Sequence, residues 1–140
     1  MNILIINGPN LGALGRREPE TYGTVPFDTF LYGLQNAYPQ HKIVCFQSDI
    51  EGELVRRLQK ADEVCDAVVL NAGAYTHTSL ALADAVRSLS IPVIEVHISN
   101  IFAREPFRHR SYLTPVCSGL VSGFGLEGYR MAVEHLISKP

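Results

Sequence analysis

The chain has 140 residues, of which 46% are hydrophobic and 19% charged, and its formal net charge at pH 7 is −2. This balance is typical of a globular protein and excludes a strongly basic nucleic-acid surface or a polybasic membrane patch. We find no apolar stretch that could span a bilayer, no signal peptide, and three cysteines far apart in sequence. We therefore expect a cytoplasmic protein with free thiols, folded as one catalytic domain over residues 1–140.

Short apolar runs alternate with helical patterns along the chain. In chain order they predict a strand at 3–6, a helix whose apolar positions run from 27 to 34 and which ends just before Pro39, a strand at 42–46, a helix at 51–64, a strand at 67–70, a helix at 78–89, a strand at 92–96, a weaker strand at 116–121 and a helix at 126–137. This order predicts a five-stranded parallel sheet with helices on both faces, the flavodoxin-like member of the doubly wound α/β class.

Four of the predicted strands are followed by polar clusters, at 7–11, 47–49, 71–79 and 95–100. The carboxyl ends of parallel strands share one edge of a sheet, so we expect these clusters to converge there. Any single cluster is equally well explained as turn chemistry, because Asn, Gly, Pro and Ser are turn formers. Convergence of several clusters is harder to explain in that way.

The cluster after the fourth strand carries the clearest catalytic pattern. Glu95 and His97 are two residues apart, so their side chains lie on the same side of a strand. A carboxylate beside an imidazole fixes the tautomer and suits a general acid or base, and Ser99 and Asn100 add donors next to it. For an isolated pair of this kind an ordinary strand end would be the better interpretation.

The segment 11–23 is long for a connection between a strand and a helix, and we interpret it as an active-site lid. Its glycines could act as hinges, and an arginine beside Tyr22 would lower the pKa of the phenol and make it a usable base. From the loop alone, a surface loop with an incidental tyrosine is slightly favoured.

Two further segments carry candidate binding residues. We expect His77 to open the third helix, where the dipole keeps it neutral and able to bond a substrate, although a plain surface histidine is a fair alternative. Arg104, Arg108 and Arg110 would suit a small anionic substrate, the alternative being a solvated basic loop. The histidines lie on separate loops without ligand spacing, so we predict no metal. The chain also lacks the nucleotide-binding glycine motifs.

Five motifs together resemble the type II 3-dehydroquinate dehydratases. They are N-G-P-N-L at 7–11, G-R-R-E-P-E-T-Y-G at 15–23, Q-S-D-I-E-G at 47–52, N-A-G-A-Y-T-H-T-S at 71–79 and E-V-H-I-S-N-I-F-A-R-E-P-F-R at 95–108. A late G-F-G-L-E-G-Y at 123–129 extends the resemblance nearly end to end. Gly12-Ala13 and Asp49 depart from the family's common Asn-Leu and Asn, at positions to which we assign no chemistry.

The resemblance implies a lyase without a cofactor that interconverts 3-dehydroquinate with 3-dehydroshikimate and water. It implies that Tyr22 removes the proton alpha to the ketone, with Arg17 holding Tyr22 as the phenolate. The enolate is then stabilised through a water held by Asn10. His97, oriented by Glu95, protonates the departing hydroxyl. The chemistry belongs to the shikimate pathway or to quinate catabolism.

The remaining roles implied by the resemblance concern binding and assembly. The ring hydroxyls are bound by three side chains, namely Asn71, His77 and Arg108. Ser99, with the backbone N–H groups of Ile98 and Ser99, binds the carboxylate, and Arg104 helps to order the lid. The family also implies a homododecamer built as four trimers, in which Asp84 reaches a neighbouring subunit's site.

Three alternatives are weighed against this reaction. A flavodoxin-like binding module would use the same sheet edge for a phosphate ligand and would need no paired acid and base. A response-regulator-like domain would need acidic residues where Asn7 and Asn71 stand, so we discount it. A Schiff-base dehydratase would need a lysine nucleophile, but the only lysines, Lys42, Lys60 and Lys139, lie away from the predicted site edge.

Overall fold

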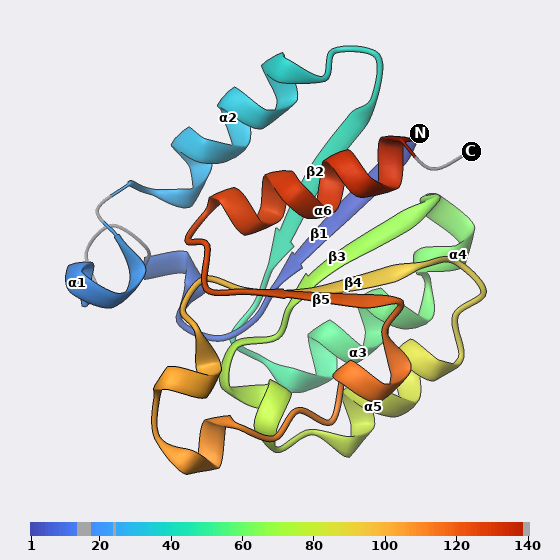
Figure 1. The fold of residues 1–140 in the computed structure, drawn as a ribbon. Coiled ribbons are helices and arrows are strands. Elements are labelled where there is room, and N and C mark those ends of the chain that lie inside the picture. Colours follow the sequence, from blue (N-terminus) through green and yellow to red (C-terminus); the bar gives the residue numbers. More distant parts are fainter. Residues whose placement is uncertain (14–17, 24, 139–140) are drawn as a thin grey trace.

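The computed structural model describes residues 1–13, 18–23 and 25–138, and in this part of the chain a single parallel sheet organises the fold (Figure 1). Its spatial order is β2-β1-β3-β4-β5, and each neighbouring pair is parallel. The strands are β1 (Asn2–Asn7), β2 (Lys42–Gln47), β3 (Ala67–Asn71), β4 (Val93–His97) and β5 (Gly119–Ser122). The predicted flavodoxin-like fold class is confirmed.

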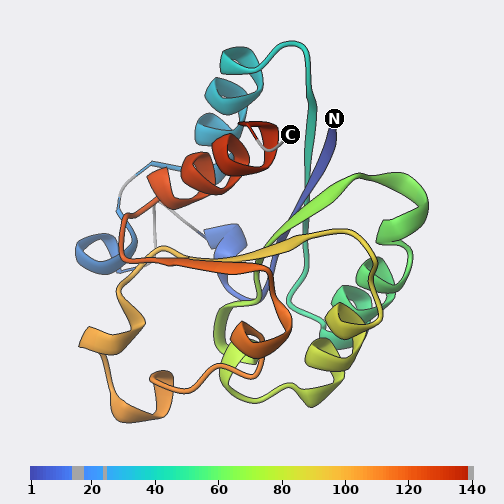
Figure 2. The same cartoon turned by 45° about the vertical axis from the view of Figure 1, so that its right-hand side comes forward.

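Helices cover both faces of the sheet. They are α1 (Pro19–Tyr22), α2 (Phe27–Ala37), α3 (Glu51–Gln59), α4 (Ala61–Val64), α5 (Leu80–Arg87) and α6 (Glu127–Ser138). The helices α2 and α6 lie on one face, and α3 and α5 lie on the other, as the two views show (Figures 1 and 2). No helix among residues 1–13, 18–23 and 25–138 is long and apolar enough to cross a membrane.

The alternation of side chains along the strands explains why both faces are apolar. In β1, Ile3 and Ile5 pack with α2 and α6, whereas Leu4 and Ile6 pack with α3 and α5. All four side chains are almost fully buried. A strand with helices on both sides needs apolar residues at successive positions, and this is why the runs in the sequence are continuous rather than alternating.

Two of the predicted helices differ from their predicted bounds by more than one residue at an end or are divided. The predicted helix at 51–64 is divided into α3 and α4, with Lys60 between them at φ −99° and ψ −2°. No side chain in this stretch explains the break. The predicted helix at 78–89 is shorter and begins at Leu80, because Ser79 Oγ accepts a hydrogen bond from the Leu82 N–H and caps it there.

The fifth strand is also shifted from its predicted position at 116–121. Residues Thr114–Val116 form a short 3-10 helix instead, and β5 begins at Gly119. Pro115 explains the shift, because it has no N–H for a sheet ladder and its fixed φ suits the first turn of a helix. Similarly, the predicted loop at 11–23 contains the 3-10 helix Leu11–Ala13 and α1 within its described residues.

The strand order places a topological switch point between β1 and β3. The chain moves outward from β1 to β2 and then crosses to β3 on the other side of β1. In the register of the sheet, Asn7 at the end of β1 stands beside both Gln47 and Asn71. At such a point the two connections run in opposite directions, and a crevice forms between them at the carboxyl edge. Doubly wound proteins bind their ligands in this crevice.

Candidate active site

A pocket lies at the carboxyl edge of the sheet, beside this switch point. It brings together segments that follow β1, β3 and β4, so three of the four predicted polar clusters converge there. The predicted site residues that line it are Asn10, Asn71, His77, His97, Ile98, Ser99, Arg104 and Arg108. The remaining cluster, at 47–49, contacts a pocket-lining residue through Asp49, which accepts a hydrogen bond from the Asn10 N–H.

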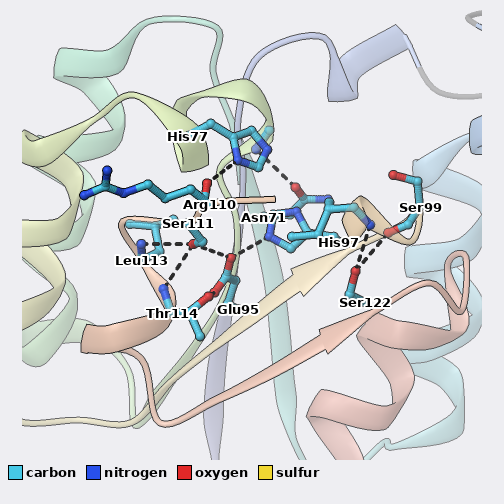
Figure 3. Close-up of polar contacts among 12 residues, drawn as sticks. Asn71, His77, Glu95, His97, Ser99, Arg110, Ser111, Leu113, Thr114 and Ser122 are labelled. Carbon is cyan, nitrogen blue, oxygen red and sulfur yellow. Dashed lines mark hydrogen bonds and ion pairs between the residues drawn. The ribbon is translucent and has the colours of Figure 1, made fainter. Parts of the chain in front are cut away.

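The floor of the pocket is formed by the carboxyl end of β4. Glu95 Oε2 lies 2.5 Å from His97 Nε2, and Glu95 and His97 are 0% and 5% exposed (Figure 3). Within the described part of the chain, no group hydrogen-bonds His97 Nδ1, and His97 lines the pocket. The pair therefore has one nitrogen committed to the carboxylate and the other available to a ligand.

Glu95 is held by two hydroxyl groups in addition to His97. Ser111 Oγ–H donates to Oε2 at 2.9 Å and Thr114 Oγ1–H donates to Oε1 at 2.5 Å. Burial by itself raises the pKa of Glu95, but hydrogen bonds from His97, Thr114 and Ser111 and the charge of His97 outweigh it, so the pKa lies below its ordinary value of 4.5. Glu95 is thus a buried carboxylate that stays ionised.

His77 lies above His97, with the two rings nearly parallel and their centroids 6.2 Å apart. Its Nδ1 lies 2.7 Å from the carbonyl oxygen of Arg110, which makes Nδ1 the donor and leaves Nε2 as an acceptor in the neutral ring. The pKa of His77 is lowered, as expected, but the main cause is burial rather than a helix dipole. His77 ends the 3-10 helix Gly73–His77 and does not open α5.

Asn71 is oriented by a buried polar network that connects three elements. Its Nδ2 donates to Tyr129 Oη at 2.8 Å, and that hydroxyl donates to Asn7 Oδ1 at 2.7 Å. Burial raises the pKa of Tyr129 strongly, so the phenol remains neutral and can act as acceptor and donor at once. Asn71 Oδ1 also accepts from the Gly73 N–H at 3.1 Å, which leaves one N–H and one lone pair of the amide for a ligand.

Asn10 reaches the pocket from the loop after β1. It has φ of 68°, a left-handed conformation that asparagine tolerates better than most residues. Its backbone N–H donates to Asp49 Oδ1 at 2.9 Å, and Gln47 Nε2 donates to the same oxygen at 3.1 Å. Asp49 therefore holds the backbone of Asn10 in place, although we assigned it no role from the sequence.

Two arginines form the cationic side of the pocket. Arg104 Nη1 donates to Ser99 Oγ at 3.3 Å, and Arg104 Nε and Arg108 Nε lie 3.7 and 3.2 Å from Glu105 Oε1. One exposed carboxylate thus braces two guanidinium groups at the rim. Arg110, the third predicted arginine, stacks over the Tyr112 ring at 4.9 Å and does not line this pocket.

The other predicted residues lie outside the pocket or outside the described residues. Arg17 falls within 14–17, which lie outside the described residues, as do Arg16 and Gly15 of the predicted lid. Tyr22 ends α1, whose Glu20 and Thr21 line a second hollow. That hollow shares three residues with the pocket, namely Ile98, Ser99 and Arg104. The predicted base is therefore carried by a segment adjacent to the site.

Asp84 is on α5 and does not line the pocket. Its side chain is 74% exposed and lies 3.5 Å from Arg87 Nη1 on the same helix. In residues 1–13, 18–23 and 25–138, no three or more His, Cys, Asp or Glu side chains are grouped so that they could hold a metal ion. The pocket therefore offers an acid–base pair, amides and guanidinium groups as its chemical equipment.

Sequence reasoning did not identify Ser111, Thr114 or Tyr129. The hydroxyl residues follow Glu95 by 16 and 19 positions and fit no periodic pattern, so no sequence signal could have found them. Tyr129 is the last residue of the late 123–129 motif, for which the sequence by itself indicates no chemical role.

Comparisons with known proteins extend over almost the whole chain. The family described as dehydroquinase class II matches residues 1–137. The chain is 49% identical to a 3-dehydroquinate dehydratase of Bacillus licheniformis, over 98% of this chain and 96% of that one. The solved type II dehydroquinase of Butyrivibrio crossotus is 46% identical, with a TM-score of 0.93 over 99% of this chain and 98% of its own. That of Propionibacterium acnes is 41% identical, with a TM-score of 0.94 over 99% and 97% of the two chains.

Proposed function

Because this chain belongs to the class II dehydroquinase family, we propose that it catalyses the reversible elimination of water from 3-dehydroquinate to give 3-dehydroshikimate. The observation that carries the proposal is the buried Glu95–His97 pair, of which His97 lines a pocket that Arg104 and Arg108 also line. An anionic hydroxy-ketone fits such a site, because it needs cationic donors for its charge and a proton donor for its leaving hydroxyl.

Elimination through an enolate needs a base, an acid and a stabiliser of the developing negative charge. Tyr22, held as phenolate by Arg17, is the proposed base for the proton alpha to the ketone. His97 is the proposed acid in its imidazolium form: its Nε2–H bonds Glu95, and its Nδ1–H on the pocket side passes its proton to the leaving hydroxyl, which departs as water. Asn10 lines the same pocket and would hold a water against the enolate oxygen.

Substrate binding is assigned to the polar groups that surround His97. We assign the ring hydroxyls to three side chains with unused hydrogen-bonding capacity, namely Asn71, His77 and Arg108. Ser99 and the backbone N–H groups of Ile98 and Ser99 would receive the carboxylate. Arg104, already bonded to Ser99 Oγ, would connect that carboxylate to the lid.

The proposal extends to the context of the enzyme. Residues 1–140 form one catalytic domain that needs no cofactor and works in the cytoplasm, in the shikimate pathway or in quinate catabolism. The assembly is a homododecamer of four trimers, and Asp84 contributes to a neighbouring subunit's site. Its exposure on α5 supports that placement, because an exposed carboxylate is accessible to a partner.

Direct assay tests the reaction. Purified protein incubated with 3-dehydroquinate should produce an enone whose absorbance rises with time, and chelators should not slow it. A protein that binds the substrate without producing the enone would instead be a binding module and would overturn the proposal.

A second assay distinguishes the enolate route from the Schiff-base route. Lys42 begins β2 and Lys60 lies between α3 and α4, so neither is at the carboxyl edge, and Lys139 lies outside the described residues. Borohydride added with substrate should therefore leave activity intact and add no substrate mass to the protein. A stable adduct in the mass spectrum would contradict the enolate route.

A further inference from the structure

The environment of Glu95 contains two residues that the proposed reaction does not yet use. Glu95 is fully buried, and its side chain accepts hydrogen bonds from His97 on its own strand and from Ser111 and Thr114 on the segment before β5 (Figure 3). Both carboxylate oxygens are occupied, Oε1 by Thr114 and Oε2 by Ser111 and His97. An isolated buried carboxylate would be costly, so these donors decide its charge state.

The hydrogen bonds of Ser111 determine the direction of its contact with Glu95. Ser111 Oγ accepts the backbone N–H groups of Leu113 at 3.0 Å and of Thr114 at 3.1 Å. A hydroxyl has two acceptor sites and one proton, so the proton of Ser111 is left for Glu95. Ser111 is therefore a donor to Glu95, and a proton on Oε2 would compete with both Ser111 and His97.

We propose that Ser111 and Thr114 are positioning residues that hold Glu95 as a carboxylate and thereby keep His97 with Nε2–H toward Glu95, so that the imidazolium form presents its Nδ1–H to the pocket. Neither hydroxyl lines the pocket, so both act through Glu95 and not on the substrate. The inference rests on the proposed function, because His97 Nδ1 is the atom assigned to protonate the leaving hydroxyl.

The charges around Glu95 support this role. Among the described residues, Cys117 and His77 are titratable groups whose pKa responds to the charge of Glu95, in addition to His97. Burial and the neighbouring Glu95 raise the pKa of Cys117 to about 12, so this thiol stays neutral. Burial lowers the pKa of His77, which favours its neutral form as well. With these two neighbours neutral, the Glu95 carboxylate is stabilised by the hydrogen bonds from His97, Thr114 and Ser111 and by the charge of His97.

Thr114 permits a clean test because it is an exposed residue. Thr114→Val keeps the shape of the side chain and removes the one proton donated to Oε1. Thr114→Val leaves Oε1 of the buried carboxylate without its donor, so some loss of folding stability is expected, and the circular dichroism spectrum and unfolding midpoint of each variant are measured before its kinetics. Thr114→Ser keeps the hydroxyl and serves as the rescue variant. Thr29→Val, at an exposed position on α2, is the matched control.

Steady-state kinetics should separate positioning from binding. In Thr114→Val we expect kcat to fall about tenfold and KM to stay within about twofold. The acidic limb of the plot of kcat against pH should move to higher pH, because loss of a hydrogen-bond donor to the charged form raises the pKa of Glu95. Thr114→Ser and Thr29→Val should keep the profile of the unsubstituted protein. Ser111→Ala should show the same displacement, with a further loss of stability from the two N–H groups left without Oγ.

Nuclear magnetic resonance makes the test independent of turnover. The ¹³C carboxyl signal of Glu95 should titrate at higher pH in Thr114→Val than in the unsubstituted protein and in Thr114→Ser. An unchanged titration together with an unchanged kcat profile would overturn the inference. If the unsubstituted protein fails to convert 3-dehydroquinate, the proposed function is wrong, while the carboxyl titration still decides whether the hydroxyls control Glu95.

Discussion

At the scale of single residues, His97 combines burial with chemical availability. Its ring is 5% exposed, its Nε2 bonds an ionised carboxylate, and it still lines the pocket. A packed side chain of this kind cannot rotate away from its carboxylate without leaving Glu95 unpaired, so its orientation is fixed before any ligand arrives. Preorganised groups cost no reorganisation at the moment of reaction.

We predict that His97→Ala and Tyr22→Phe each lower kcat by a factor of at least ~10², because each removes a separate proton transfer. Both positions are at the end of an element, so the circular dichroism spectrum and the unfolding midpoint should report a folded protein. Steady-state assay of the two variants is the measurement. Near-full activity in either variant would remove that residue from the mechanism.

The pKa shifts of His77 and Glu95 predict that acid destabilises the protein in two steps. The pKa of His77 is lowered from 6.5 by burial, so the unfolded chain takes up its proton first and stability declines as pH falls below about 6.5. The pKa of Glu95 is lowered from 4.5, because the hydrogen bonds from His97, Thr114 and Ser111 and the charge of His97 outweigh the opposing effect of burial. Ionised Glu95 therefore stabilises the folded protein above a pH of about 4.5, and this stabilisation is lost as the pH falls through the pKa that Glu95 has in the folded protein.

Denaturant unfolding from pH 8 to pH 4 measures both steps. His77→Gln should flatten the stability curve just below pH 6.5 and leave the Glu95 step in place. Glu95→Gln should be less stable than the unsubstituted protein at pH 7, with the difference narrowing below pH 4.5. A stability curve whose slope between pH 6.5 and 5 is the same with and without His77 would contradict the assignment.

At the scale of elements, the pocket depends on the close approach of the loops that follow β1 and β3. The Gly8 N–H donates to the carbonyl oxygen of Asn71 at 2.7 Å, and a Cβ at Gly8 would lie 2.4 Å from the carbonyl oxygen of Ala72. A contact that close is made with backbone, which cannot move aside as a flexible side chain could. The glycine therefore lets two site-bearing loops pack directly on each other.

We predict that Gly8→Ala lowers the free energy of unfolding by about 1–3 kcal/mol, the usual cost of overpacking, and disturbs the site through Asn71. Gly33→Ala is the control, because Gly33 is exposed on α2 with no neighbour within 4 Å of its added Cβ. In a helix this change should stabilise by about 0.5–1 kcal/mol. Urea unfolding compares the two, and an equal effect in both variants would refute the steric explanation.

At the scale of the whole molecule, α5 presents an exposed surface that bears on assembly. Leu80 is 62% exposed and the Asp84 side chain is 74% exposed, and the two are four residues apart on one face of the helix. Single exposed apolar residues are ordinary on protein surfaces. Leu80, however, is on the same face of α5 as Asp84, the residue that we propose contributes to a neighbouring subunit's site.

We predict that Leu80→Asp weakens the proposed trimer and that the resulting monomer is folded but nearly inactive, because each site then lacks Asp84 from its neighbour. Leu80→Met, which keeps an apolar side chain, should keep both assembly and turnover. Size-exclusion chromatography with light scattering gives the mass, and the enone assay gives the activity of each peak. A monomer with full turnover would refute both the assembly and the shared site.

The sequence alone was enough to predict the parallel sheet, its doubly wound class and the contact between Glu95 and His97. Apolar runs at 3–6, 67–70 and 92–96 are local signals of buried strands, and polar residues after them indicate the carboxyl edge. Glu95 and His97 are two positions apart, so the period of a strand already places their side chains together. What could not be predicted were boundaries set by local turns, such as the delayed start of β5 after Pro115.

The tertiary structure alone decided how these groups are held. Thr114 reaches Glu95 across 19 positions, Asp49 holds Asn10 across 39, and Tyr129 reaches Asn7 across 122. Such contacts depend on which elements the fold brings together at the switch point, and no periodicity of 2 or 3.6 residues encodes them. The reactive pair is therefore a property of one strand, whereas its charge state and its orientation belong to the whole molecule.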